Sequence, residues 1–208
     1  EGPYGERRKV SGLPTFLFTV SSVVKDIRKC ITMDAKCLGD LVYILGETRD
    51  ELGGSEYYQM MGEIGLNVPW VDVNKSRPMY LALHRAIEAG LVSSAHSVSR
   101  GGLAVHLAMV AMGGETGMEI ELNNAPTAEE LIDTKILYSE SSGRFIVTID
   151  PAKQHAFEGI FSGMNAGLVG AVSETSRFRI KGNGGGLIID EDIMQLKDSW
   201  KRTFGGLI

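Results

Sequence analysis

The chain has 208 residues, 43% of them hydrophobic and 23% charged, which is ordinary for a soluble globular protein and excludes a disordered tail, a coiled coil or a collagen-like repeat. Its 21 basic and 26 acidic side chains give a net charge of −5, which argues against a nucleic-acid-binding protein. No apolar run approaches the roughly 20 residues of a transmembrane helix and no secretory leader is recognisable, so we expect no membrane association.

The two cysteines, Cys30 and Cys37, lie seven positions apart, without CxxC spacing or a histidine beside them. They are therefore expected to be free thiols of a reducing compartment, for which the cytoplasm is the default. The chain opens with Glu1 and lacks an initiator methionine, so we expect it to be a piece of a longer polypeptide.

In chain order, strands are expected where β-branched and aromatic residues cluster or where apolar and polar residues alternate. They are predicted at residues 13–20, 30–33, 40–46, 91–98, 118–122, 145–149, 168–172, 177–180 and 187–189. The first has no preceding helical partner, so it is expected to be the last strand of an upstream domain.

Helices are expected between these strands. A short turn is predicted near 57–61, a helix from Ser76 to Gly90 with Pro78 in its first turn, and a helix from Leu103 to Met112 ended by Gly113 and Gly114. A short helix is predicted from Thr127 with Glu130 completing a capping box, then a helix over 151–161 capped by Asp150, and a final helix capped by Asp190. The alternation predicts an α/β or α+β sandwich in which a mixed sheet is flanked by helices.

Three segments are candidates for chemistry, and 26 glycines, several of them paired at element junctions, draw attention to them. In the first, over 52–57, Gly53, Gly54 and Ser55 can either form a compact anion cradle, with Ser55 capping a helix, or be an ordinary turn.

The second segment, over 95–103, runs from a strand into a helix through Gly101 and Gly102, with Arg100 just before them. Such a junction presents free amides at the positive end of a helix dipole, which suits a phosphate. His96 is either a general base or a structural histidine at the end of a strand.

The third segment, over 138–144, combines hydroxyls with Glu140 and Arg144. Arg144 can act as a forked phosphate donor, or the segment is a polar loop in which Glu140 and Arg144 pair or cap neighbouring helices. The four histidines are scattered, no carboxylate cluster has ligand spacing, and no nucleophile elbow is present, so no metal or catalytic residue is predicted.

Taken together and in order, these three segments resemble the last domain of the phosphoribosylformylglycinamidine synthase family, in its large, synthetase component. Residues 12–15 and 31–40 resemble the run that leads into that domain. The resemblance implies the fold of an aminoimidazole ribonucleotide synthetase C-terminal domain over 37–208. It also implies that residues 1–36 are a linker and the tail of a preceding N-terminal-type domain.

The resemblance further implies a parent ligase that uses ATP and Mg²⁺ to convert formylglycinamide ribonucleotide, with ammonia from glutamine, in purine biosynthesis. Its expected partners are the remaining domains of the parent chain, a glutaminase subunit and a small bridging subunit, with a homodimer of the fragment as a further possibility. The candidate phosphate contacts are Gly53, Gly54, Ser55, Arg100, Gly101, Gly102 and Arg144.

One departure from the family bears on activity. Where the family has His-Asp-x-Ser-Asp-Gly-Gly-Leu, Ser97 and Arg100 replace the two acids, so the fragment is not expected to catalyse alone. Two alternatives remain open. One is a non-catalytic scaffold or subunit-docking domain. The other is the C-terminal domain of a relative of the aminoimidazole ribonucleotide synthetase, selenophosphate synthetase or thiamine-monophosphate kinase type.

Overall fold

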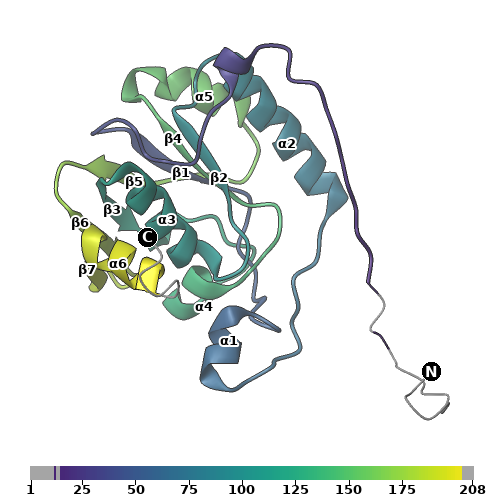
Figure 1. The fold of residues 1–208 in the computed structure, drawn as a ribbon, viewed down its shortest axis with the longest axis vertical. Helices are drawn as coiled ribbons and strands as arrows, with labels where there is room; N and C mark the ends of the chain where they lie inside the picture. Colours follow the sequence, from purple (N-terminus) through teal and green to yellow (C-terminus); the bar gives the residue numbers. More distant parts are fainter. Residues whose placement is uncertain (1–11, 13–14, 203–208) are drawn as a thin grey trace, which may run out of the picture.

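A seven-stranded mixed sheet organises the chain (Figure 1), whose computed structural model describes residue 12 and residues 15–202. The spatial order is β2-β4-β1-β5-β3-β6-β7, and every neighbouring pair is antiparallel except β3 with β6. The strands are β1 (Leu41–Leu45), β2 (Ser94–Ser97), β3 (Gly117–Glu121), β4 (Phe145–Ile149), β5 (Ala166–Ser173), β6 (Arg177–Lys181) and β7 (Leu187–Asp192). The expected mixed sheet flanked by helices is confirmed.

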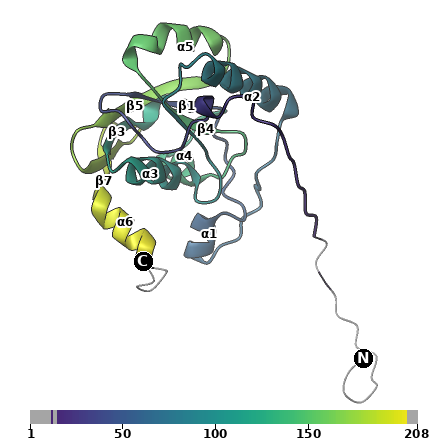
Figure 2. The ribbon, with the colours of Figure 1, turned by 45° about the horizontal axis from the view of Figure 1, so that its top comes forward.

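Helices cover both faces of the sheet (Figures 1 and 2). They are α1 (Glu56–Met61), α2 (Val73–Glu88), α3 (Gly102–Gly114), α4 (Asp133–Tyr138), α5 (Gln154–Ile160) and α6 (Ile193–Arg202), with short 3-10 turns at Ile27–Lys29, Leu122–Asn124 and Pro151–Lys153. No helix of the described part of the chain is long and apolar enough to cross a membrane.

The central strand β1 shows how the sequence builds two cores. Its side chains alternate, so Val42 and Ile44 join a core with α3, α4 and α6, while Tyr43 and Leu45 join a second core with α2 and α5. Each core is apolar and fully buried, so the sheet is fixed between two helical layers.

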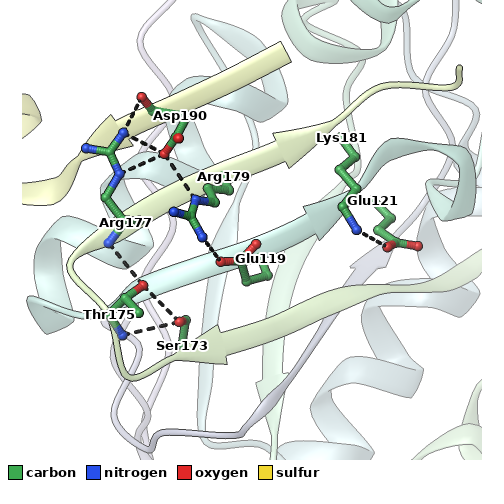
Figure 3. A network of polar contacts seen from close by, with 8 residues as sticks. All are labelled: Glu119, Glu121, Ser173, Thr175, Arg177, Arg179, Lys181 and Asp190. Atoms are coloured by element: carbon green, nitrogen blue, oxygen red, sulfur yellow. Dashed lines mark hydrogen bonds and ion pairs between the residues drawn. The ribbon is translucent and has the colours of Figure 1, made fainter. Parts of the chain in front are cut away.

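Strands β3, β6 and β7 carry charged side chains on the face opposite α3 and α6 (Figure 3). Arg179 bridges Glu119 on β3 and Asp190 on β7, and Lys181 pairs with Glu121. Cross-strand pairs of opposite charge stabilise neighbouring strands modestly, and they let this part of the sheet face water without a helix over it.

Several expected elements are wrong. Residues 15–20 and 30–33 form no strand. In the described part of the chain no strand lies beside residues 15–20, and residues 30–33 make one contact with β2, from the Ala95 amide to the Thr32 carbonyl at 3.2 Å, without a continuing ladder; residues 13 and 14 lie outside the described part. No helix starts at Thr127, which instead forms an isolated bridge with Thr48, and the helix begins at Asp133. The strand expected over 91–98 is limited to Ser94–Ser97.

Helix ends also differ from expectation. Helix α2 begins at Val73 with Asp72 as its N-cap, so Pro78 lies inside the helix and not in its first turn. Gly113 and Gly114 belong to α3, whose last residue is Gly114 and whose C-cap is Glu115. Asp192, not Asp190, accepts hydrogen bonds from the first amides of α6, because β7 continues to Asp192 and the helix begins only at Ile193. The predicted caps Ser55 and Asp150 are confirmed.

Candidate functional site

The three sequence segments meet at one side chain, Glu140. Its Oε1 accepts hydrogen bonds from the backbone amides of Glu56 and Gly101, each at 2.8 Å. Glu56 is the first residue of α1 and Gly101 the N-cap of α3, so one carboxylate faces the positive ends of two helices. The position predicted for a phosphate is therefore taken by an anion of the chain itself.

The turn at Gly53 and Gly54 is closed by backbone hydrogen bonds. The Gly53 amide donates to the Asn67 carbonyl at 2.8 Å, and the Gly54 amide donates to the Ile64 carbonyl at 2.7 Å. Ser55 Oγ accepts from the Tyr58 amide and caps α1. A Cβ at Gly53 would lie 2.7 Å from the Asn67 backbone, so close packing explains this glycine. These contacts describe a packed turn, with its amides committed internally.

The backbone amides just before α3 are also hydrogen-bonded within the chain. The Gly102 amide donates to the Ser99 carbonyl at 3.0 Å. Gly102 has φ +73°, and a Cβ there would lie 2.7 Å from the Leu137 carbonyl oxygen, so only glycine lets α3 approach α4 this closely. The exposed Arg100 side chain forms an ion pair with Glu56, the residue that also donates to Glu140.

Arg144 is almost fully buried and donates to the chain from all three guanidinium nitrogens. Nε donates to the Ser141 carbonyl at 3.0 Å, Nη1 to Thr48 Oγ1 at 2.8 Å, and Nη2 to the Ser139 carbonyl at 2.6 Å. Burial lowers the pKa of Arg144 to about 10, against the opposing charges of Glu51 and Glu140, so the group stays cationic at neutral pH. Arg144 thus binds two loops together from inside.

His96 belongs to a histidine pair. His106 Nδ1 lies 2.8 Å from His96 Nε2, and the Ser99 amide donates to His106 Nε2 at 3.0 Å. His106 Nε2 also lies 3.1 Å from the Arg100 carbonyl oxygen, so both ring nitrogens of His106 have partners within the chain. Burial lowers the pKa of both imidazoles. This geometry gives His96 a structural partner, which the sequence could not reveal.

A cavity of about 590 Å³ lies between the end of β1, the start of α2 and the loops 141–143 and 162–165. At its wall Glu47 accepts from Arg49, Lys75 and Asn165, and the Arg49 guanidinium lies 4.2 Å from the centre of the Trp70 ring. Burial raises the pKa of Glu47, but hydrogen bonds from Lys75 and Arg49 outweigh this and hold it below its usual value.

Sequence reasoning missed this cavity, because its residues come from four segments without a shared motif. Among the described residues, Glu51 also lines it, with Oε1 accepting from the Trp70 amide and Oε2 buried without a partner.

No group of three His, Cys, Asp or Glu side chains suited to a metal ion occurs in the described part of the chain.

The chain is similar to a known protein family and to several solved structures. A family model described as "AIR synthase related protein, C-terminal domain" matches residues 38–183. PurL of Thermotoga maritima complexed with FGAR is 22% identical with a TM-score of 0.72, over 82% of this chain and 30% of that one. PurLQS from the same organism is 21% identical with a TM-score of 0.70, over 82% and 28%.

A hydrogenase maturation protein, HypE of Escherichia coli, has the same fold at a greater distance. It is 17% identical with a TM-score of 0.58, over 78% of this chain and 51% of that one. The chain spans less than a third of the PurL structures that it matches.

Proposed function

The chain belongs to the AIR synthase-related protein family, as its C-terminal domain, and we propose that it is the C-terminal domain of the ATP-dependent ligase that converts formylglycinamide ribonucleotide to formylglycinamidine ribonucleotide. The observation that carries the proposal is the fit to PurL bound to FGAR, which has a higher TM-score than the fit to HypE. The meeting of the three family-like segments around Glu140 supports it.

In this proposal the domain holds the parent enzyme together and does not turn over substrate alone. ATP and Mg²⁺ would supply the activation of the formamide oxygen in the parent, but the residues here do not fit a metal-bound phosphate. Ser97 and Arg100 stand in place of acids, and the glycine amides and Arg144 donate to the chain. Gly101 becomes a phosphate contact only if Glu140 leaves, and Gly53, Gly54, Ser55, Arg100, Gly102 and Arg144 only if they give up the partners described above.

The organisation of the parent is part of the same proposal. Residues 1–36 would belong to a preceding domain and linker, and the start of the family match at residue 38 supports that boundary. A glutaminase subunit and a small bridging subunit would be the partners, in the cytoplasm, by analogy with the PurLQS structure of a relative. The second candidate, a non-catalytic docking domain, is favoured by exposed apolar side chains such as Leu66 and Trp70.

A domain exchange tests the proposal. The part of T. maritima PurL that matches this chain would be replaced by residues 38–202, which keep β7 and α6 with the core they complete, and ATP-dependent conversion of FGAR would be measured with ammonium as the nitrogen source. A second chimera, which carries the matched part of HypE at the same position, is the control: it has the same fold but comes from a protein outside PurL. We expect conversion with the first chimera and none with the second. A folded first chimera that binds FGAR without converting it would contradict the ligase proposal.

A further inference from the structure

Side chains with unused hydrogen-bonding capacity line the cavity beside Trp70. Glu51 is only 4% exposed, and its Oε1 accepts from the Trp70 amide at 3.3 Å while its Oε2 is buried without a partner. A buried acceptor without a donor lowers stability, so an O–H or N–H group of a ligand at this wall would gain from donating to it. This oxygen therefore favours a ligand that carries hydrogen-bond donors.

Other polar groups of the wall are also unpaired. The hydroxyls of Ser76, Ser142 and Ser162 and the side-chain amide of Asn74 hydrogen-bond to no other residue in the described part of the chain. Each of these groups can both donate and accept. A ligand that uses them needs several groups that also do both, as the hydroxyls of a sugar do.

The charges of the wall disfavour an ion as the ligand. Five charged side chains line the cavity, namely Glu47, Arg49, Glu51, Asp72 and Lys75. Arg49 and Lys75 both donate to Glu47 Oε1, at 2.7 and 2.8 Å, so the two cations share one carboxylate. Three carboxylates against two cations leave no surplus positive charge for a phosphate, and Glu51 also lies in the field of the buried Arg144. The part of the ligand that enters the cavity should therefore be uncharged.

Trp70 adds an apolar surface to these polar groups. It is 56% exposed, and the Arg49 guanidinium lies 4.2 Å from the centre of its ring, so one face of the ring is covered and the rest of the side chain is open. A sugar ring has an apolar C–H face and a rim of hydroxyls, so it can pack on an aromatic ring and hydrogen-bond at its edge. A nonpolar molecule would leave the polar wall unpaired.

We propose that this cavity binds the ribose ring of a ribosyl compound, with a hydroxyl donating to Glu51 and the C–H face of the ring packed beside Trp70. The volume of about 590 Å³ lies within the range of roughly 300–1,000 Å³ that is typical of small-molecule sites. The unpaired polar groups and the balance of charge call for a sugar. The choice of ribose rests on the proposed function, whose substrate is a ribonucleotide.

Tryptophan fluorescence tests the site on this chain alone. Trp70 and Trp200 are its two tryptophans, so the variant Trp200→Phe leaves Trp70 as the reporter. Ribose and ribose 5-phosphate should both change its emission, with similar dissociation constants in the millimolar range because so small a ligand makes few contacts. Inorganic phosphate should change nothing. A response to phosphate as strong as that to ribose 5-phosphate, a stronger response to glucose than to ribose, or no response to either ribose compound would overturn the proposal.

Two substitutions in this background test the named contacts. Glu51→Gln should weaken ribose binding about fivefold, because a neutral amide oxygen replaces a charged acceptor. Asn74→Ala, on the exposed start of α2, should weaken it about threefold and leave the fold intact. Glu119→Gln is the matched control, because Glu119 lies on β3 and outside this cavity. Equal binding by all three variants would overturn the proposal, and if circular dichroism shows that Glu51→Gln does not fold, Asn74→Ala decides.

The chimera described above separates this site from the ligase proposal. Conversion of FGAR by the chimera, with no binding of ribose to this chain, would overturn the ribose site and leave the ligase proposal standing. Ribose binding that depends on Glu51, with a folded chimera that binds FGAR without converting it, would do the reverse.

Discussion

The three segments 52–57, 95–103 and 138–144 meet around Glu140 and Arg144, and we call this place the junction. Substitution of Arg144 offers the sharpest test of whether the junction stabilises the fold or binds a phosphate. The proposed change is Arg144→Met, which keeps most of the length of the side chain and removes every donor. In the structure three buried acceptors depend on this guanidinium, the carbonyls of Ser139 and Ser141 and the Thr48 hydroxyl. If the joint is structural, the variant should be less stable in the absence of any ligand.

The expected cost follows from those contacts. A buried acceptor left without a donor costs about 1–3 kcal/mol, and three of them would cost more than the variant gains by no longer burying a cation. The net loss should be about 3–5 kcal/mol, which lowers the melting temperature of a chain of this size by roughly 6–20 °C. Arg144→Lys should lose less, because an ammonium keeps the charge but cannot reach all three acceptors.

Urea unfolding followed by circular dichroism measures this loss, with Arg100→Met as the control. The Arg100 side chain is 78% exposed and forms a surface ion pair with Glu56, so its removal should lower the free energy of unfolding only slightly. Equal and small losses in both variants would refute the structural role of Arg144. A stable Arg144→Met variant that also loses a melting shift induced by phosphate or Mg-ATP would instead establish the phosphate role.

Glu140→Ala should destabilise the chain by about 2–3 kcal/mol and speed hydrogen exchange at the Gly101 amide, because that amide loses a charged acceptor; unchanged exchange would place the acceptor elsewhere. Gly102→Ala should cost more than Gly54→Ala in urea unfolding, because only the first Cβ meets backbone atoms. For the histidine pair, burial lowers the pKa of His96 and His106, so the unfolded chain takes up protons first as the pH falls. Stability measured in urea should then decrease below about pH 6.5, with a shallower slope in His106→Asn.

Local sequence was sufficient to predict the secondary structure where the stabilising contacts are local or follow from burial in the sheet. Residues 145–149 are a continuous β-branched and apolar run, and they form β4 between two neighbouring strands. Asp150 caps the following turn through its own side chain, as predicted from the Asp-Pro pair. In both cases the stabilising contacts lie within a few residues or follow from general burial in the sheet.

Predictions from local sequence were wrong where a residue far away in the chain determines the secondary structure. Residues 15–20 are rich in aromatic and β-branched residues and have high β propensity, yet a strand needs a neighbour to pair with, and none of the described strands lies beside them. The Thr127 to Glu130 spacing matches a capping box, but Thr127 pairs with Thr48 across the loop and no helix starts there. A short pattern of residues does not carry the position of a partner that is tens of residues away.

The same limit applies to the candidate site. The three segments that the sequence selected do meet, so the motif order carried real spatial information. Whether an amide in such a junction is free depends on the carbonyls of Ile64 and Asn67, which belong to no motif. The cavity beside Trp70 was missed for a related reason, since its walls combine β1, α2 and two loops.

From its charges we expect the junction around Glu140 to disfavour an outside anion. The two cations are Arg100, paired with Glu56, and Arg144, which lies in the field of Glu51 and Glu140. Three carboxylates thus face two cations before any ligand arrives, and a phosphate would add roughly 1.5–2 further negative charges. Binding would therefore require Glu140 to leave the two helix ends it now caps, and the amides it releases would have to stabilise the phosphate by more than the closed joint loses.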